Sequence, residues 1–193
     1  MGAFDRYAPF IKDFIYRNNW ESLRAVQVAA ADAIFNTEEN VLLCASTASG
    51  KTEAAFFPIL TLFSEDMPSS IGAIYIGPLK ALINDQFSRL EALCAEADIP
   101  VWHWHGDVSQ SHKAKMLKKP SGILQITPES LEAMLIRKHA MIPKLFGDLR
   151  FIVIDEVHSL MRADRGGQTL CLIERLSKLS GSNPRRIGLS ATI

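Results

Sequence analysis

The segment VLLCASTASGKTEAA, residues 41–55, contains the pattern that decides the fold of this chain. Its opening run, VLLCA, is apolar throughout, which is typical of a strand covered on both faces of a sheet. Small residues rich in Ser, Ala and Gly come next, and an apolar stretch with helical character follows them. A strand, a tight loop and a helix in direct succession predict the first unit of an α/β domain.

The same alternation continues through the rest of the chain. The other strand candidates are short apolar runs at residues 73–77, 101–104, 123–127, 151–155 and 186–190. Helices are predicted between the strands at residues 52–63, 79–97, 109–118, 129–139 and 167–180, and before the first strand at residues 4–17 and 22–36. This order predicts an α/β fold with an open, mostly parallel sheet and helices on both faces. In such sheets ligands bind beyond the carboxyl ends of the strands, so the residues that follow each strand are the candidates for function.

Length and charge limit the organisation and the partners. A chain of 193 residues is long enough for one buried core, and we predict a helical extension at 1–21 and one domain at 22–193. Lys plus Arg and Asp plus Glu number 21 each, so the formal net charge is zero. No global positive field attracts nucleic acid, and any contact with a polyanion must be local.

The sequence also indicates the compartment. Three cysteines, Cys44, Cys94 and Cys171, lie far apart without a zinc-binding or paired pattern, as in proteins of a reducing compartment. The first residues do not resemble a secretory signal, and the longest apolar runs reach only half of the ~20 residues that a membrane-spanning helix needs. We therefore expect a soluble, cytoplasmic protein that makes no membrane contact.

The loop after the first strand favours a phosphate-binding loop (P-loop). In such a loop backbone N–H groups surround the phosphates, and here Lys51 would reach the β and γ phosphates while Thr52 would offer its hydroxyl to Mg²⁺. The small residues expected to surround the phosphates are Thr47, Ala48, Ser49 and Gly50. A β-carbon at Ala48 restricts positive φ at a position where glycine is often found. The alternative is a chance turn, which the strand before and the helix after it disfavour.

Two adjacent carboxylates, Asp155 and Glu156, follow the apolar run FIVI. A parallel sheet would bring them to the same edge as the P-loop. There Asp155 would hold Mg²⁺ through its water shell, while Glu156 would orient and deprotonate the attacking water. The alternative is a helix N-terminus enriched in acids that complement its dipole.

The other strand ends carry residues suited to the backbone of a nucleic-acid strand. Lys80 lies in the first turn after one strand, Thr127 is a natural N-cap after another, and His105, Gly106 and Asp107 follow a third. Each is an ordinary helix start when taken singly. Together they would place N–H groups, hydroxyls and a lysine along one edge, where successive phosphates can bind.

The last strand candidate ends in Ser190, Ala191 and Thr192. Ser-Ala-Thr by itself carries no functional signal. At another strand end of the same sheet, however, its hydroxyls are expected to come within reach of His158, two residues after Glu156.

The motifs ASTASGKT, PLKALINDQ, TPESLEAML, DEVH and LSATI occur in this order, and they resemble motifs I, Ia, Ib, II and III of superfamily 2 DExH-box helicases. The segments TPESLEAML and DEVHSLMRADRGGQTLCLIERL are most similar to the Lhr-like branch of that family. The resemblance covers residues 22–193. It implies a RecA-like motor domain that hydrolyses ATP with Mg²⁺ and contacts DNA or RNA through the sugar-phosphate backbone.

The resemblance also implies roles for individual residues. Gln27, ahead of the P-loop, is similar to the glutamine that recognises the adenine ring of ATP in this family. The residues implied in nucleotide binding, metal binding and hydrolysis are Lys51, Thr52, Asp155 and Glu156. Those implied in coupling hydrolysis to movement are His158, Ser190 and Thr192, and those implied in contacts with the strand are Lys80, Thr127, Arg165 and Gly166. Phe10 lies where some relatives have a stacking aromatic, although packing of its helix onto the domain is the favoured explanation.

The sequence departs from the family pattern at two points. Ala48 replaces a glycine of the commoner P-loop sequence, which predicts a modest loss of nucleotide affinity. The second RecA-like domain of the family, which carries an arginine finger and half of the nucleic-acid track, does not occur in residues 1–193. We therefore expect this chain by itself to bind nucleotide weakly and to hydrolyse almost none of it.

Three other patterns receive structural explanations. His103, His105 and His112 have no Cys or acidic residue at ligand spacing, which disfavours zinc. The basic group Lys113, Lys115, Lys118 and Lys119 is expected to be a solvated helix face. Trp102 and Trp104 are expected to pack in the sheet rather than to stack on bases.

Two other classes of function remain as alternatives to a motor. One is a docking module that binds nucleotide and nucleic acid without unwinding. The other, a P-loop kinase for a small metabolite, is disfavoured because it gives DEVH and Ser-Ala-Thr no role.

Overall fold

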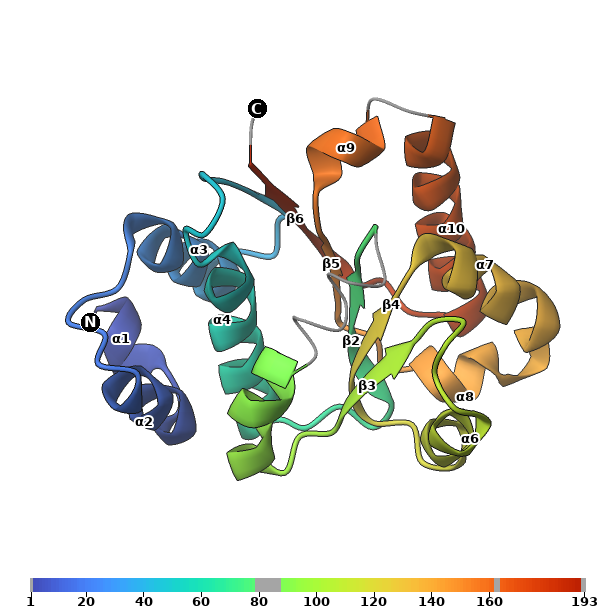
Figure 1. The fold of residues 1–193 in the computed structure, drawn as a ribbon, viewed down its shortest axis with the longest axis horizontal. Coiled ribbons are helices and arrows are strands. Elements are labelled where there is room, and N and C mark those ends of the chain that lie inside the picture. The colour runs from blue at the N-terminus through green and yellow to red at the C-terminus, as the bar shows by residue number, and fades with distance from the viewer. Residues whose placement is uncertain (1, 79–87, 162–163, 192–193) are drawn as a thin grey trace.

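A six-stranded, all-parallel sheet forms the centre of the molecule in a computed structural model that describes residues 2–78, 88–161 and 164–191 (Figure 1). The strand order is β1-β6-β5-β2-β4-β3. The strands are β1 (Val41–Cys44), β2 (Ile71–Ile76), β3 (Val101–Trp104), β4 (Gly122–Ile126), β5 (Phe151–Ile154) and β6 (Arg185–Ser190). The predicted fold class and all six predicted strands are confirmed.

Helices cover both faces of the sheet, and each face has its own apolar core. The helices are α1 (Ala3–Arg6), α2 (Pro9–Arg17), α3 (Ala25–Asn36), α4 (Lys51–Glu65), α6 (Gln110–Lys118), α7 (Pro128–Arg137), α8 (Ile142–Phe146), α9 (Val157–Met161) and α10 (Asp164–Ser180), with short 3-10 turns η1 (Ala95–Ala97) and η2 (His139–Met141). Residues 88–94 are also helical. One core contains residues of α2, α3, α4 and 88–94, with α1 packed against it, and the other contains residues of α6, α7, α8 and α10.

Strand β2 shows why the strands read as continuous apolar runs. Ala73 and Tyr75 belong to the core under α4, whereas Ile74 and Ile76 belong to the core under α7 and α8. All four side chains are fully buried. Because successive side chains of a strand point to opposite faces, a strand with a core on each side must be apolar at every position.

The parallel arrangement brings all the carboxyl ends of the strands to one edge. The P-loop follows β1 and the acidic pair follows β5, and in the sheet these two strands are separated only by β6. The hydrogen-bond register of the sheet aligns Leu43 with Leu189 and Val153 with Ile187. The P-loop and the acidic pair, which lie far apart in the sequence, therefore follow strands that end at the same edge of the sheet.

The N-terminal helices differ from the prediction. The predicted helix at 4–17 is divided into α1 and α2, because Tyr7 and Ala8 are extended, with ψ of 146° and 152°. A residue before proline avoids the helical region, and Pro9 then begins α2. The helix predicted at 22–36 likewise begins later, at Ala25, because Arg24 is extended.

Other boundaries were also displaced or missed. β2 begins at Ile71, two residues before the predicted start, and α8 and α9 lie where no helix was predicted. Within the helix predicted at 79–97, residues 79–87 lie outside the described residues, and residues 88–94 are helical as predicted. Helices as short as α8 and α9 have too few residues to show a periodic apolar pattern.

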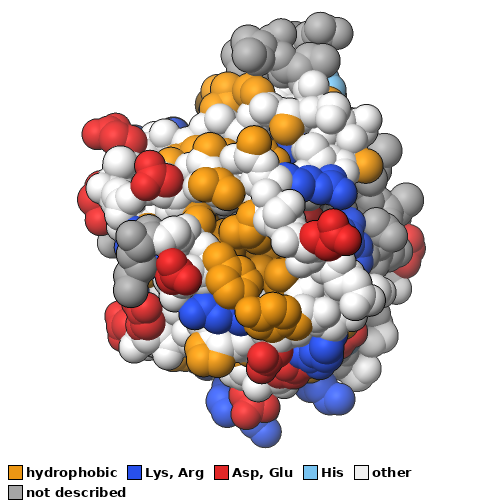
Figure 2. Space-filling model, turned by 90° about the vertical axis from the view of Figure 1, so that its left-hand side faces the viewer, with side chains coloured by type: hydrophobic (Ala, Val, Ile, Leu, Met, Phe, Trp, Pro, Cys, Tyr) orange, Lys and Arg blue, Asp and Glu red, His pale blue; other side chains and the backbone are white. Residues whose placement is uncertain are grey.

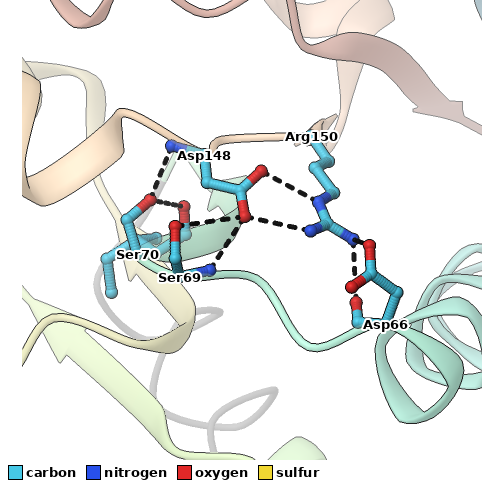
Figure 3. Close-up of polar contacts among 6 residues, drawn as sticks. Asp66, Ser69, Ser70, Asp148 and Arg150 are labelled. Carbon is cyan, nitrogen blue, oxygen red and sulfur yellow. Dashed lines mark hydrogen bonds and ion pairs between the residues drawn. The ribbon is translucent and has the colours of Figure 1, made fainter.

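A polar network holds the edge of the sheet opposite the functional residues (Figure 3). Arg150 donates to both carboxylate oxygens of Asp148, at 3.0 and 2.9 Å, and to the backbone oxygen of Asp66 at 2.8 Å. The backbone N–H of Ser69 donates to Asp148 at 2.8 Å. These hydrogen bonds, above all that from Arg150, lower the pKa of the Asp148 carboxyl. The network joins the loop after α4 to the segment before β5.

Arg185 fixes the end of α3 against the sheet. Its guanidinium donates to the backbone oxygens of Ile34 and Ala33, at 2.9 and 3.0 Å, and to the hydroxyl of Thr37 at 2.9 Å. The last carbonyls of a helix lack partners within the helix, and Arg185 supplies a donor to that of Ile34 from the start of β6, while the carbonyl of Ala33 also accepts from Thr37.

The surface formed by the N-terminal helices contains an apolar hollow. Figure 2 faces this side of the molecule and shows hydrophobic side chains gathered near its middle. A hollow of about 570 Å³ lies between α1 and α3, lined by apolar residues that include Ala3, Val28 and Phe35.

Within the described residues, no helix has both the length and the apolar character needed to cross a membrane.

Candidate functional site

The P-loop is built by backbone conformations that only small residues allow. Gly50 has a φ of 78° and directly precedes α4, which begins at Lys51. A β-carbon on Gly50 would lie 2.6 Å from Nε2 of Gln27, so the end of that side chain would have to move. The left-handed backbone favours glycine at position 50, and the nearby Gln27 side chain adds to this preference.

Ala48 also adopts a left-handed conformation, with a φ of 60°. The β-carbon of this alanine was expected to restrict positive φ. The residue nevertheless adopts a positive φ in the structure. For a residue with a β-carbon this conformation costs about 1–2 kcal/mol, so the loop stores backbone strain at this point.

Lys51 is bonded to its own loop. Its ammonium donates to the backbone oxygens of Ala45 and Ser46, at 2.6 and 2.8 Å. The side chain thus curls back over the loop instead of extending away from it. An anion in the loop would compete with these two carbonyl oxygens for the ammonium, and a negatively charged oxygen makes the stronger hydrogen bond.

The acidic pair is held by β2 and by its own backbone. The Tyr75 hydroxyl donates to Oδ2 of Asp155, and the backbone N–H of Glu156 donates to Oδ1 at 2.9 Å. Tyr75 is fully buried, and only 9% of Asp155 is exposed. Glu156 has a φ of 51°, which is rare for a residue with a β-carbon and redirects the chain between β5 and α9. The two hydrogen bonds therefore fix the orientation of the Asp155 carboxylate. The positive φ of Glu156 turns the chain directly after it.

The P-loop and the acidic pair meet in one cavity of about 260 Å³. Its lining residues are Trp20, Arg24, Thr47, Ala48, Ser49, Gly50, Lys51, Thr52, Glu53, Arg89, Asp155 and Glu156. The sequence analysis predicted that Lys51 and Asp155 come to a common edge of the sheet, and both line this cavity.

The sequence analysis did not identify four of the lining residues. Trp20 packs edge-on against Phe14, and Arg24 donates to the backbone oxygen of Ala48. Arg89 forms an ion pair with Glu53, which is buried in the first turn of α4. Arg24 could have been identified from the sequence as a candidate near the nucleotide, because it lies three residues before Gln27 at the start of a predicted helix. Nothing in the sequence links Trp20 or Arg89 to the P-loop, since tertiary packing alone brings them there.

Gln27 lies beneath the P-loop and is fully buried. Its Oε1 accepts a hydrogen bond from the backbone N–H of Arg24 at 2.9 Å, and its Nε2 is buried without a hydrogen-bond partner. Because the Gln27 side chain lies beside Gly50, we expect a movement of the P-loop to change the exposure of this amide. Its role in adenine recognition stays a prediction. Phe10 is half-buried against the core of the N-terminal helices and does not line the cavity.

A chain of polar contacts through His158 leads from Glu156 to β6. Nε2 of His158 lies 3.1 Å from Oε2 of Glu156, and Nδ1 of His158 lies 3.2 Å from the Ser190 hydroxyl. The predicted contact between Ser190 and His158 is therefore present. Thr192 lies outside the described residues.

The residues predicted to contact a nucleic-acid strand are only partly described. Thr127 is the N-cap of α7 and accepts a hydrogen bond from the backbone N–H of Ser130 at 3.3 Å. Gly166 is buried in the first turns of α10. Lys80 and the side chain of Arg165 lie outside the described part of the chain. Their roles stay predictions.

The histidines and tryptophans of β3 are engaged in packing. The ring centroids of His103 and His112 lie 4.9 Å apart, and burial lowers the pKa of His103 to about 4. In the described residues no group of His, Cys, Asp and Glu side chains has the arrangement of a metal site. Trp104 is buried, and Trp102 packs against the core while it donates to the backbone oxygen of Ser121 at 2.9 Å.

The donor set of the cavity fits a magnesium nucleotide. The Thr52 hydroxyl and the Asp155 carboxylate both line the cavity, and oxygen ligands of these kinds suit Mg²⁺. Lys51 supplies a cation, and the N-terminus of α4 adds backbone N–H groups with a partial positive charge. The residues that are present can therefore bind phosphates and a metal ion in one place.

The sequence pattern of the DEAD/DEAH box helicases matches residues 24–193. The ATP-dependent helicase Lhr-Core of Methanothermobacter thermautotrophicus is 35% identical, and the alignment covers 96% of this chain but only 23% of that protein. The chain therefore spans a quarter or less of the length of the curated relatives that it matches.

Solved structures give the same assignment. The Mycobacterium smegmatis helicase Lhr bound to ssDNA and AMP-PNP superimposes with a TM-score of 0.83 and 28% identity, over 100% of this chain and 26% of that one. The DUF1998 helicase MrfA bound to DNA and AMPPNP gives a TM-score of 0.86 and 30% identity, over 98% of this chain and 27% of that one. The chain carries the ordered motifs, the parallel sheet and the matching sequence pattern, and it belongs to the DEAD/DEAH box helicase family.

Proposed function

We propose that this chain is the first motor domain of an ATP-dependent helicase or translocase, which hydrolyses ATP to move on or unwind nucleic acid when it is joined to a second RecA-like domain. The observation that supports it most is the cavity in which Lys51 and Thr52 meet Asp155 and Glu156. Relatives that cover this chain almost completely are named ATP-dependent helicases.

The cavity residues that were predicted from the sequence each have a part in the proposed reaction. The P-loop backbone and Lys51 bind the phosphates, and Lys51 leaves the oxygens of Ala45 and Ser46 to do so. Thr52 and Asp155 would hold Mg²⁺, which when bound neutralises charge on the phosphate oxygens. Glu156 orients the attacking water and accepts its proton.

The hydrogen bonds of Glu156 support a route from hydrolysis to movement. Because His158 contacts both Glu156 and Ser190, a change in the charge or position of Glu156 is transmitted to the end of β6. We propose that closure against the second domain acts on this route. Thr127, Lys80, Arg165 and Gly166 are the proposed contacts with the strand, which is DNA or RNA.

A docking module is the second candidate. The two functions differ in whether Glu156 serves as the base. In the full-length protein Glu156→Gln should abolish turnover and preserve ATP binding if the chain is a motor. Equal turnover in the variant and in the unaltered protein would favour a docking module.

Nucleotide binding is tested first, on the 193-residue chain. We expect Lys51→Ala to weaken the binding of a fluorescent ATP analogue at least about tenfold, because a charge-assisted phosphate contact is lost. Lys178→Ala is the matched control, since Lys178 is exposed on α10, away from the cavity. Equal affinity of the two variants would contradict the proposed nucleotide site.

A further inference from the structure

A second cavity is lined by residues of α6 and α7. Both helices lie on the side of the sheet away from the N-terminal helices (Figure 1). The volume of the cavity is about 330 Å³, and its lining residues are Trp104, His105, Gly106, Gln110, Lys113, Ser130, Ala133, Met134, Arg137 and Lys138. We call it the α6–α7 groove. Trp104 and Met134 are buried, whereas Gln110 and Arg137 are exposed at the surface.

The charged side chains that line the α6–α7 groove are all of one sign. Lys113, Arg137 and Lys138 are cations, and no Asp or Glu is among the described residues of the lining. The ion pairs found in the described part of the chain do not include these three side chains. In a chain with a formal net charge of zero, this is a local concentration of positive charge.

The position of Lys113 is fixed by the aromatic side chain beneath it. Its ammonium lies 5.4 Å from the ring centroid of Trp104, within the range of a cation–π contact. The sequence analysis assigned Lys113 to a solvated helix face together with Lys115, Lys118 and Lys119. The structure separates them, because only Lys113 of this group lines the α6–α7 groove.

The α6–α7 groove is continuous with the proposed contacts to the strand. Ser130 lines its near end, and the Thr127 hydroxyl donates to the Ser130 hydroxyl at 3.0 Å. From Ser130 the lining follows α7 to Arg137, a rise of roughly 10 Å at 1.5 Å per residue. An extended single strand spaces its phosphates more widely than the roughly 3.4 Å of helix axis per phosphate in each strand of a duplex, so this length faces two to three phosphates.

We propose that the α6–α7 groove is a phosphate-binding subsite for a single strand of nucleic acid, which extends the strand contacts from Thr127 along α7 to Lys138. This inference rests on the proposed function, since it requires that the chain bind nucleic acid. Lys113 and Arg137 face the strand from two helices, and Lys138 contacts the phosphate farthest from Thr127. An acidic peptide offers the same charge, but the continuity with Thr127 favours a nucleic-acid strand.

The test uses two triple variants of the 193-residue chain with equal loss of charge. The groove variant is Lys113→Gln, Arg137→Gln and Lys138→Gln, and the control is Lys115→Gln, Lys118→Gln and Lys119→Gln, whose side chains are exposed and do not line the groove. The affinity for a fluorescent single-stranded oligonucleotide is measured over a series of salt concentrations. Circular dichroism confirms that both variants fold.

We expect the slope of log affinity against log salt to become less steep by about 2 in the groove variant, because each lost phosphate contact accounts for about 0.7. The control should keep a slope close to that of the unaltered chain. Equal slopes in the two variants would overturn the inference and leave the proposed function intact. If only the full-length protein binds oligonucleotide, the two triple variants are compared in that protein with the same expected slopes. If neither the unaltered chain nor the full-length protein binds oligonucleotide, the proposed function fails and the inference fails with it.

An oligoglutamate peptide distinguishes the other class of ligand. If the peptide binds the unaltered chain and loses affinity only in the groove variant, while oligonucleotide binding is the same in all three proteins, the groove is a peptide site and the inference is wrong. Weak peptide binding that is equal in both variants agrees with the inference.

Discussion

At the scale of single residues, the site depends on side chains that hold the reactive groups in position. Asp155 accepts hydrogen bonds at both carboxylate oxygens, and Gly50 is confined by Gln27. The sequence identified Asp155 and Gly50 from their places after strands. It gave no sign that Tyr75, in the middle of an apolar strand, orients Asp155, because that contact crosses from β2 to the end of β5.

Tyr75→Phe removes one hydroxyl and leaves the packing of the ring unchanged. We expect the affinity for nucleotide in the presence of Mg²⁺ to fall by a factor of about five, since a hydrogen bond to a charged group contributes about 1 kcal/mol or more. In EDTA the variant and the unaltered chain should bind nucleotide with the same affinity. Without Mg²⁺, Asp155 holds no metal ion, so its orientation by Tyr75 no longer affects binding. Isothermal titration under both conditions checks the difference.

Tyr7→Phe is the control for this prediction. The Tyr7 hydroxyl is also buried but has no hydrogen-bond partner, and burial raises its pKa. Its removal should leave nucleotide affinity unchanged in both conditions and should not lower the free energy of unfolding. A loss of Mg²⁺-dependent affinity as large as that of Tyr75→Phe would show that the hydroxyl of Tyr75 has no specific role.

At the scale of elements, β3 and α6 contain a group of histidines whose charge state affects stability. Burial, and after it the nearby His112 and His105, lower the pKa of His103 to about 4. The pKa of His112 is also lowered, first by burial and then by Lys115. The folded state therefore favours the neutral form of these rings, whereas in the unfolded chain they take up protons near pH 6.5.

The sign of the pH dependence follows from these shifts. Above pH 6.5 the rings are neutral in both states, and the stability is complete. As the pH falls from 6.5 to about 4, the unfolded chain binds protons that the folded chain does not bind at His103, so the free energy of unfolding decreases. Below about pH 4 this contribution becomes constant. Urea unfolding over this pH range measures the effect.

His103→Gln should make the decrease smaller, because one titrating ring is removed. His139→Gln is the control, since His139 is exposed in η2. If the pH profiles of the two variants coincide, the histidines of β3 and α6 do not cause the acid sensitivity.

At the scale of the whole molecule, we propose that the cavity closes against a second domain. In the relatives the matching segment is a quarter of the protein or less, so most of each relative lies outside the aligned region. We expect the 193-residue chain to bind ATP and to turn it over at a rate near background. An arginine finger accelerates related reactions by about 10³ to 10⁵, and we propose that the second domain supplies it.

Release of phosphate, measured with and without single-stranded oligonucleotide, checks this expectation. The comparison is the same assay on the full-length protein, in which turnover should be stimulated by the strand. Robust turnover by the 193-residue chain alone, abolished by Glu156→Gln, would contradict the need for a second domain.

The sequence by itself determined the fold class, the strand positions and the two motifs of the ATP site. Apolar runs in strands buried on both faces are visible without structure, and P-loops have a characteristic order of residues. The tertiary structure decided which distant residues join those motifs. Trp20, Arg89 and Tyr75 reach the cavity or Asp155 through packing between elements, and Lys113 is separated from its neighbours because one side of α6 faces α7. Local patterns report the period of an element, whereas contacts between elements depend on how those elements pack in space.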